Sequence, residues 1–301
     1  MTLDHPQKRA GRDREVEGWV AGAVATVVVG ASFPVSAALG DFPAAYGQAA
    51  RYLVGALILT AILRGRLKRP TTTELVLLAG VAAVGMAGFN LLLLAAVERI
   101  GGANTGVLVG LSPLLLALTR PTTRLLTSAA VVVAGAALVT GTDGGVTALG
   151  LAFAAGALLC EVGFTLLAAP LVPRLGPTNV AAWAAILATA QLGVLAAATE
   201  QPQLPTAGEA AALLYLATIT TALAFVCWFS AVRSLGAGRA GLLVGLMPVA
   251  AVAVDAVMTG DPPSAAAIAG TALVGAGVAL GSRRPAADFA ATAMEQPARV
   301  G

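Results

Sequence analysis

The chain has 301 residues, of which 58% are hydrophobic and only 11% are charged. Water-soluble domains carry about 25% charged residues, so this composition excludes a soluble globular protein. The formal net charge of +3 gives no nucleic-acid signal, because the basic residues gather in short stretches between apolar runs.

Ten apolar runs are long enough to cross the hydrocarbon core of a bilayer as helices. They cover residues 19–39, 47–63, 74–96, 104–119, 125–141, 149–171, 179–199, 208–231, 240–258 and 264–282. Polar segments 1–18 and 283–301 flank them as tails that we expect to be disordered. The first run is too long, and its charged flank too mixed in sign, for a cleaved signal peptide.

The basic residues predict the orientation of these spans. With the N-terminus in the cytoplasm, every Lys and Arg except Arg51 and Arg99 falls on the cytoplasmic side, as the positive-inside rule requires. The acidic Asp41, Glu98 and Glu200 fall on the outer side. The sequence therefore predicts a multi-pass protein of the cell membrane with both termini in the cytoplasm.

One block of the sequence occurs twice. Ala96–Pro113 reads AVERIGGANTGVLVGLSP, and Ala231–Pro248 reads AVRSLGAGRAGLLVGLMP, with no gap between the two copies when they are aligned. We call residues that this alignment pairs, such as Pro113 and Pro248, repeat equivalents, and we apply the same offset along the whole chain.

Each copy belongs to a half with five predicted spans, residues 19–142 and 149–282. Because five is odd, the second half enters the membrane in the opposite orientation. The predicted fold is an all-α integral membrane protein whose ten transmembrane helices form two inverted five-helix repeats.

Short motifs within both halves resemble the drug/metabolite transporter superfamily, specifically its ten-helix EamA-type members. Gly30-Ala31-Ser32-Phe33-Pro34 is similar to the first-helix motif, although the usual Trp is missing, and Ala50-Arg51-Tyr52 is similar to the opening of the second helix. Leu111-Ser112-Pro113 and Leu246-Met247-Pro248 resemble the paired helix-4 and helix-9 prolines. The Gly-Glu pair of the family appears as Gly260-Asp261 in the second half and is replaced by Leu125-Leu126 in the first.

The resemblance implies transport of small organic metabolites, such as amino acids or amphipathic toxic compounds, across the bilayer. We expect a secondary transporter that exports its substrate by alternating access, with the proton gradient or substrate exchange as the driving force. There is no GxxxxGK[ST] loop for ATP. The alternatives are a passive facilitator or channel of the same fold, a sensor or scaffold, and a membrane-embedded enzyme, for which no convergent catalytic group is visible.

Few residues suit a metal or a cofactor. His5 lies in the polar N-terminal tail, and Cys160 and Cys227 lie inside apolar runs, so the sequence predicts no metal site, no cofactor and no disulfide. The predicted partners are a small-molecule substrate and the lipid bilayer, with no nucleic acid. A homodimer is compatible with the sequence.

Three prolines are predicted to interrupt membrane-spanning helices: Pro34, Pro113 and Pro248. Pro113 and Pro248 occupy the same repeat position in short glycine-rich spans, and such paired broken segments point to a transporter's site. Each proline frees the carbonyl four residues earlier, which lines a wet cavity or is satisfied by a neighbour such as Ser112.

Glu161 is the sharpest single candidate, because a carboxylate inside an apolar span is costly and should face the bundle interior. Burial favours the neutral form of a carboxyl group, so Glu161 suits proton coupling or binding of a cationic group; the alternative is a structural hydrogen bond to another helix. Asp255 lies in the outer part of its span, and its repeat equivalent is Arg120. The two are candidates for gate charges, and the alternative for Arg120 is solvation at the membrane interface.

Further candidates are polar or aromatic. Arg51 opens its span on the outer side, where it pairs with Asp41 or Glu98 or binds a substrate carboxylate. Asn90 and Gln191 are the costliest neutral side chains to bury, and interhelical hydrogen bonding is their alternative role. Trp183 and Trp228 are candidates for an aromatic wall, together with Tyr52 and Phe89.

Overall fold

The computed structural model describes residues 6–32, 35–36, 39, 42–140, 147–260 and 262–282. The regular elements within this part of the chain are all helical. Each of the ten predicted spans overlaps at least one helix. The elements in order are α1 (Pro6–Ala31), α3 (Ala44–Ile62), α4 (Thr72–Gly80), the π-helix η1 (Val81–Gly88), α5 (Phe89–Val109), α6 (Ser112–Ala117), α7 (Thr123–Thr140), α8 (Ala148–Ala168), α9 (Val172–Leu175), α10 (Pro177–Thr199), α11 (Ala207–Tyr215), the π-helix η2 (Leu216–Leu223), α12 (Ala224–Leu235), α13 (Ala237–Gly241), the 3₁₀ helix η3 (Leu242–Gly245), α14 (Leu246–Thr259) and α15 (Ala265–Ser282).

By length and apolar composition, six helical stretches among the described residues are able to cross a membrane. They are Thr72–Gly101, Ala148–Ala168, Pro177–Thr199, Ala207–Leu235, Ala237–Val254 and Ala265–Ser282. Thr123–Val139 is apolar but shorter. A multi-pass membrane protein follows from these spans, and the count of ten stays a prediction.

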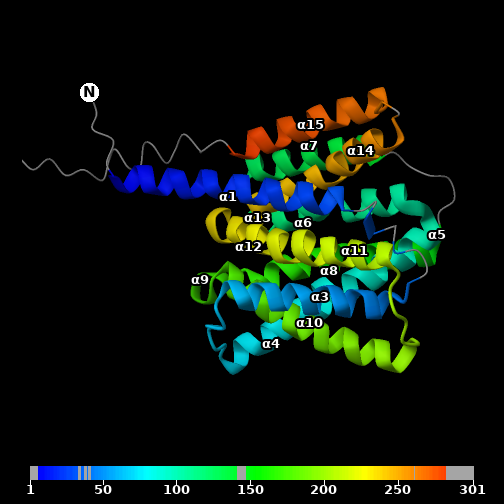
Figure 1. The fold of residues 1–301 in the computed structure, drawn as a ribbon. Coiled ribbons are helices and arrows are strands. Elements are labelled where there is room, and N and C mark those ends of the chain that lie inside the picture. The colour runs from blue at the N-terminus through cyan, green and yellow to red at the C-terminus, as the bar shows by residue number, and fades with distance from the viewer. Residues whose placement is uncertain are drawn as a thin grey trace, which may run out of the picture.

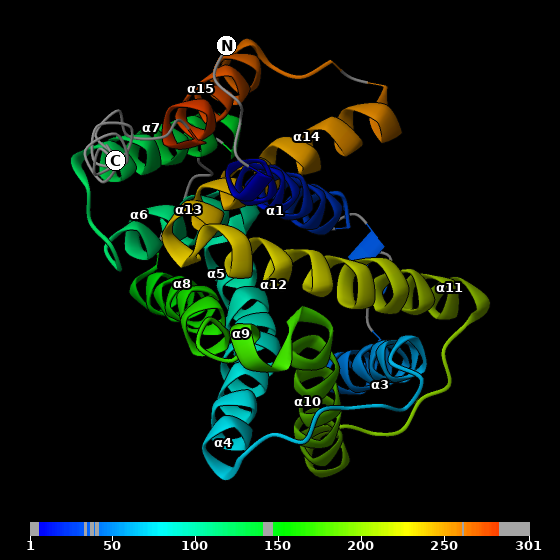
Figure 2. The ribbon, with the colours of Figure 1, turned by 90° about the vertical axis from the view of Figure 1, so that its left-hand side faces the viewer.

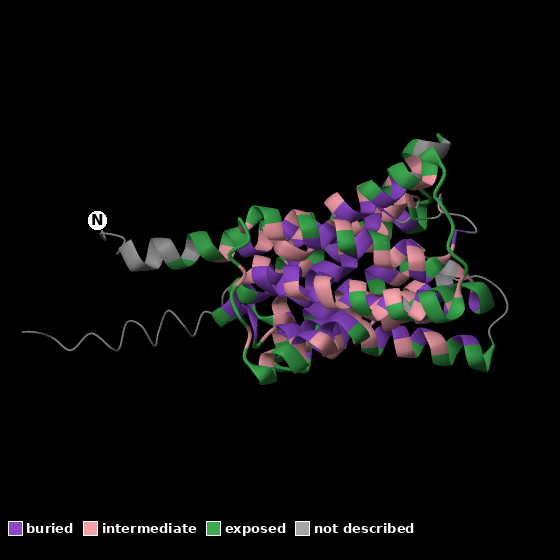
Figure 3. Cartoon of the chain, turned by 60° about the horizontal axis from the view of Figure 1, so that its bottom comes forward, coloured by how far each residue is buried: buried purple, intermediate pink, exposed green. Residues whose placement is uncertain are grey.

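The bundle is apolar on its outer flanks as well as in its core. Large apolar side chains stand exposed on its flanks, among them Leu57, Val194 and Val257, and Figure 3 shows exposed residues on the outward faces and both ends with buried residues between them. Exposed apolar surface of this extent is stable only against lipid. The N-terminal tail differs from expectation: α1 is helical from Pro6, where Glu15 pairs with Arg239 and ties the extension to α13.

The helices run lengthwise and pack in neighbouring pairs (Figure 1). α7 packs on α15, α5 on α8, α3 on α10 and α1 on α12. Seen along the bundle in Figure 2, α7 and α15 lie on one side and α4 and α10 on the opposite side, with α12 across the middle. The α7–α15 contact is close, because a Cβ on Gly270 would lie 2.5 Å from the carbonyl oxygen of Gly135.

Local irregularities recur at the offset of the repeated block. Thr71 with Glu74, and Thr206 with Glu209, form complete capping boxes before α4 and α11. Each box is followed by a π-helix, η1 or η2, at the same spacing. Glycines with nearly identical dihedral angles then turn the chain, at Gly101 (φ 78°, ψ 161°) and at Gly236 (φ 77°, ψ 161°). The repeated sequence block is therefore matched by repeated backbone geometry.

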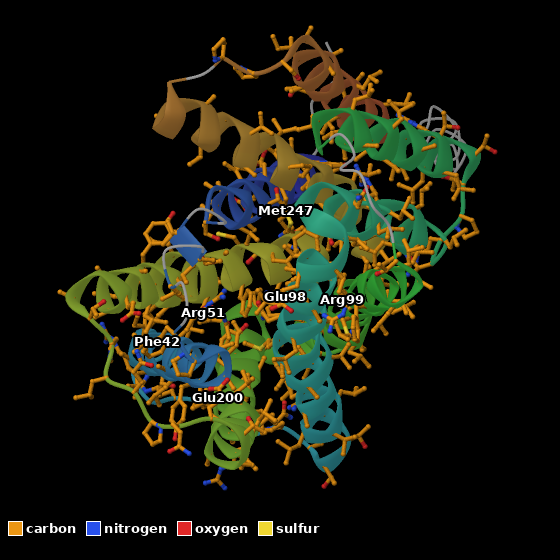
Figure 4. All side chains as sticks on the ribbon, turned by 90° about the vertical axis from the view of Figure 1, so that its right-hand side faces the viewer. Phe42, Arg51, Glu98, Arg99, Glu200 and Met247 are labelled. Atoms are coloured by element: carbon orange, nitrogen blue, oxygen red, sulfur yellow. The ribbon has the colours of Figure 1, made fainter. Side chains whose placement is uncertain are left out.

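The two ends of the bundle hold different groups. The end that faces the viewer in Figure 4 carries Phe42, Glu98 and Glu200, and we call it the Glu200 end. The opposite end, where α1 begins, holds α9 and the α3–α4 connection, residues 63–71 (Figure 1). We call it the Arg174 end.

Candidate functional site

A cavity of ≈ 250 Å³ lies inside the bundle. Its walls come from both halves of the chain. Arg51, Asn90, Glu161 and Trp228 line it, four of the residues that the sequence singles out. The elements that supply them are α3, α5, α8 and α12. A cavity shared between two halves is where a transporter of this general architecture holds its substrate.

Arg51 enters the cavity from α3 and is 8% exposed. Its Nε donates to Thr221 Oγ1 at 2.8 Å, and its Nη1 donates to Gln48 Oε1 at 3.2 Å. These bonds use two of the five N–H donors of a guanidinium group. The guanidinium carbon also lies 5.1 Å from the ring centre of Tyr52, so the cation is held by neutral partners.

The predicted ion pair between Arg51 and Glu98 is not formed. Glu98 is instead 3.6 Å from Arg99 in an exposed surface pair at the Glu200 end (Figure 4). The reason is geometric: Glu98 stands on α5 facing solvent, whereas Arg51 turns into the bundle toward η2. Asp41, the other predicted partner, lies outside the described residues.

Glu161 contributes the acidic side chain of the cavity. Among the described residues it has neither a hydrogen bond nor an ion pair. The predicted alternative, a structural hydrogen bond to another helix, is therefore absent within the described part of the chain. The cavity thus offers one guanidinium and one carboxyl group, both with unused hydrogen-bonding capacity.

Neutral polar groups complete the wall. Asn90 Nδ2 donates to the Tyr52 hydroxyl at 3.2 Å and to the Met86 carbonyl at 2.6 Å. Thr220 Oγ1 is buried and has no hydrogen-bond partner among the described residues. Trp228 also lines the cavity, and its Nε1 donates to Thr165 Oγ1 at 3.3 Å.

Aromatic rings from both halves of the chain also line the cavity. Phe164 lies 5.5 Å from Phe225 and 5.3 Å from Phe229 between ring centres, and Tyr52 stacks on Phe225 at 6.5 Å. Gly85 makes room for this cluster, since a Cβ there would lie 2.2 Å from Phe164. The arrangement suits a small molecule with an apolar body and charged ends.

Much of the lining consists of repeat equivalents. In six equivalent pairs, both residues line the cavity. These pairs are Thr26 and Glu161, Val29 and Phe164, Gly85 and Thr220, Phe89 and Ala224, Asn90 and Phe225, and Leu93 and Trp228. Four of these pairs lie in or just after the π-helices η1 and η2. π-Helical turns shift the facing of the residues that follow them and are frequent at functional sites.

Other sequence candidates lie elsewhere. Trp183 Nε1 donates to the Lys68 carbonyl at 3.0 Å, and Gln191 Nε2 donates to the Ala79 carbonyl at 3.1 Å. Both therefore join α10 to neighbouring segments outside the cavity. Ser112 is fully buried, and its Oγ has no hydrogen-bond partner among the described residues. Asp255 lies on α14, and its side chain is outside the described residues.

The prolines mark helix interruptions where the structure describes them. α5 ends at Val109 and α6 begins at Ser112, next to Pro113. In the second half a 3₁₀ turn, Leu242–Gly245, precedes α14, which contains Pro248 in its first turn. Met247 reaches the cavity from this break. Pro34 lies outside the described residues.

Sequence reasoning missed Gln48, Phe164, Phe225 and Met247. A signal for three of them was present: Phe225 is the repeat equivalent of Asn90, Met247 is the equivalent of Ser112, and Gln48 is the equivalent of Trp183. Applying the repeat offset to each candidate would have found all three. Phe164 carries no such signal, because its equivalent is Val29 and apolar side chains are also common on lipid-facing positions.

Comparison with known proteins also indicates a membrane transporter. Residues 148–283 match the EamA-like transporter family. "Uncharacterized transporter YdeK" of Bacillus subtilis (strain 168) is 28% identical over 251 residues, which are 78% of this chain and 86% of that protein. "Uncharacterized transporter YetK" of the same organism is 24% identical over 269 residues, 83% and 82% of the two chains.

A solved structure described as "Crystal structure of protein" shares the fold. The TM-score is 0.73 with 19% sequence identity, and the match covers 89% of this chain and 97% of that chain. At this level of identity the similarity is one of architecture alone.

Proposed function

From the chain's membership of the drug/metabolite transporter superfamily, we propose that it is a secondary transporter of small organic metabolites. It works by alternating access between two inverted five-helix repeats in the cell membrane. The repeats are residues 19–142 and 149–282, the ten spans are those of the sequence, and both termini are cytoplasmic. The proposed partners are a small-molecule substrate and the bilayer, and the homodimer stays a prediction.

The observation that carries the proposal is the shared cavity. Arg51 and Glu161 place a positive and an acidic group in one enclosed wall, and neither has an ion-pair partner among the described residues. The aromatic rings of Phe164 and Phe225 line the same cavity. Desolvated charges of this kind are retained when they bind charged groups of a ligand. The substrate class that fits is a zwitterionic metabolite with an apolar body.

The repeat equivalents support alternating access. Six equivalent pairs line the same cavity, and the capping boxes, π-helices and glycine turns recur at the same spacing. In an inverted repeat, equivalent residues meet at the site on the pseudo-two-fold axis. The proposed direction is export. Glu161 is the proposed proton-coupling group, because it is an acidic side chain inside the cavity whose partners are supplied by water or substrate.

The second candidate is a passive facilitator of the same fold. The polar lining of the cavity is compatible with it. The two functions separate in proteoliposomes: a secondary transporter accumulates substrate against its concentration gradient when a proton gradient is applied, and a facilitator only equilibrates it.

The test compares metabolites released by cells that express the wild type, Glu161→Gln or an empty vector at matched membrane levels. Glu98→Gln is the matched control, because Glu98 is an exposed carboxylate outside the cavity. We expect a zwitterionic compound to be enriched outside cells with the wild type and Glu98→Gln. With Glu161→Gln its export should fall at least tenfold, as expected for loss of about 1.4 kcal/mol or more of site interaction.

Equal export by Glu161→Gln and the wild type would remove Glu161 from the mechanism while leaving a transporter. If no compound distinguishes the wild type from the empty vector, and purified protein also moves none of the twenty amino acids in proteoliposomes, the proposed substrate class is wrong.

A further inference from the structure

The lining of the cavity is only partly symmetric. Beside the six equivalent pairs, one face of α3 touches it at Ala44, Gly47, Gln48 and Arg51. Their repeat equivalents on α10 do not line the cavity, and they are Asn179, Ala182, Trp183 and Ile186. This α3 face and Phe42, which lies at the Glu200 end (Figure 4), have no counterparts in the lining from the equivalent segments, so the cavity extends toward the Glu200 end.

The equivalent face of α10 is sealed at the Arg174 end. Asn179 Oδ1 accepts from the Lys68 backbone N–H at 2.9 Å, and Trp183 Nε1 donates to the Lys68 carbonyl. Lys68 Nζ donates to the Arg174 carbonyl at 2.9 Å, and the Arg174 guanidinium pairs with Glu74. These contacts join residues of the first half to residues of the second half.

A second, independent observation concerns Ser112. Its repeat equivalent, Met247, lines the cavity. Ser112 is fully buried, yet its hydroxyl has no hydrogen-bond partner among the described residues. A buried hydroxyl without a partner costs roughly 1–3 kcal/mol, which is relieved if the group faces water or a ligand in another conformation.

We propose that the α10 face formed by Asn179, Trp183 and Ile186, together with Ser112, lines the substrate pathway in the conformation that opens at the Arg174 end. The inference rests on the proposed alternating access. When two inverted halves exchange conformations, each residue takes the surroundings of its equivalent. The α3 face of Gln48 and Arg51 then packs away as the α10 face does in this structure.

The exchanged pathway differs chemically from the one in the structure. Arg51 corresponds to Ile186, so the pathway at the Arg174 end lacks the guanidinium group, while Gln48 corresponds to Trp183. Glu161 belongs to the paired part of the lining and stays in the cavity in both conformations. An anionic group of the substrate is therefore held by Arg51 in the conformation open at the Glu200 end.

The test measures the reactivity of single cysteines toward a membrane-impermeant, positively charged methanethiosulfonate. The background carries Cys160→Ala and Cys227→Ala, which leaves no native thiol. Ser112→Cys and Ile186→Cys report on the proposed pathway, and Gln48→Cys reports on the cavity in the structure. Ala188→Cys is the matched control on α10, because Ala188 is buried and its equivalent, Leu53, does not line the cavity.

Glu74→Gln is added to weaken the seal at the Arg174 end. Glu209→Gln is its control, since Glu209 occupies the same place in the second capping box without an arginine partner among the described residues. In Glu74→Gln we expect Ser112→Cys and Ile186→Cys to react about threefold or more faster from the Arg174 side, and Gln48→Cys to react more slowly from the other side. Glu209→Gln should leave all three rates unchanged.

The assignment is supported if Ser112→Cys and Ile186→Cys react from the Arg174 side in either background while Ala188→Cys does not react. If both cysteines stay unreactive in both backgrounds while the same vesicles transport substrate, the assignment is wrong and the transporter function stands. If the vesicles transport nothing but the two cysteines react, the proposed function fails and the conformational exchange stands.

Discussion

The two ends of the bundle share repeated backbone motifs but carry different polar contacts. At the Arg174 end, Lys68, Asn179, Trp183 and the Arg174–Glu74 pair tie the α3–α4 connection to α9 and α10. At the Glu200 end, Glu200 accepts hydrogen bonds from the backbone N–H groups of Ala45 and Tyr46, at 2.9 Å each, and the cavity extends alongside.

The repeat equivalents explain this difference. Arg174 corresponds to Leu39, and Lys68 corresponds to Gln203, so the cationic side chains of one end have neutral counterparts at the other. Glu74 corresponds to Glu209, which keeps its capping box and has no arginine beside it among the described residues. The comparison teaches that the same backbone motifs carry a polar cluster between the two halves at the Arg174 end and, among the described residues, no equivalent cluster at the Glu200 end. Under the proposed alternating access, these unrepeated side chains favour the conformation that is closed at the Arg174 end.

The largest expected effect concerns Arg51 at the Glu200 end. Thr221→Val removes the hydroxyl that accepts from Arg51 Nε and leaves a buried cationic donor without its partner. We expect a loss of about 2 kcal/mol in the free energy of unfolding, measured by denaturant unfolding in detergent with tryptophan fluorescence. Thr218→Val is the control, because the Thr218 hydroxyl bonds only its own helix. Equal effects of the two changes would contradict the role of the Arg51 contact.

A smaller effect is expected at Glu200 itself. Pro43 precedes α3 and supplies no side-chain cap, so Glu200, at the end of the neighbouring helix α10, satisfies the first N–H groups of α3. Glu200→Gln keeps one acceptor and loses the charge, which should cost about 1 kcal/mol. The loss of stability is measured by thermal unfolding of Glu200→Gln. Glu98→Gln, which changes a surface carboxylate at the same end, is the control. Identical melting temperatures for the two variants would show that this cap does not hold α3.

The smallest expected difference compares the two capping boxes directly. Thr71→Ala and Thr206→Ala each remove a hydroxyl that accepts from the glutamate N–H three residues later, at 3.3 Å in both cases. Each should cost about 1 kcal/mol in the free energy of unfolding. Because the local geometry is the same, the two losses should agree within roughly 0.5 kcal/mol. A larger gap would show that the surroundings of each end dominate the cap.

Parts of the site were predictable because charged, polar and aromatic side chains inside an apolar run are visible in the sequence. Arg51, Asn90, Glu161 and Trp228 were singled out in this way, and all four line the cavity. Trp183 and Gln191 were singled out by the same reasoning and instead bond neighbouring segments. Polarity identifies residues that need a partner, but it does not say whether the partner is a helix or a ligand.

The aromatic part of the site was only partly predictable. Tyr52, Phe89 and Trp228 were expected to form an aromatic wall and do line the cavity, whereas Phe164 and Phe225 were not identified. In a membrane, lipid-facing residues such as Leu57 and Val194 are as apolar as the buried ones, so helical periodicity does not distinguish the inward face. The π-helices add to this, because they rotate the facing of Phe89 and Phe225 relative to a regular α-helix.

The sequence by itself determined that the chain is apolar enough to cross a membrane several times, that one block recurs in the second half, and that Glu161 lies inside an apolar run. These properties follow from composition and spacing, because the transfer of each segment into the bilayer depends on the residues of that segment alone. Only the tertiary structure decided that Arg51 and Glu161 share one cavity and that contacts between segments far apart in the chain seal the Arg174 end. Such contacts depend on which helix faces meet, and that is set by packing across the whole bundle.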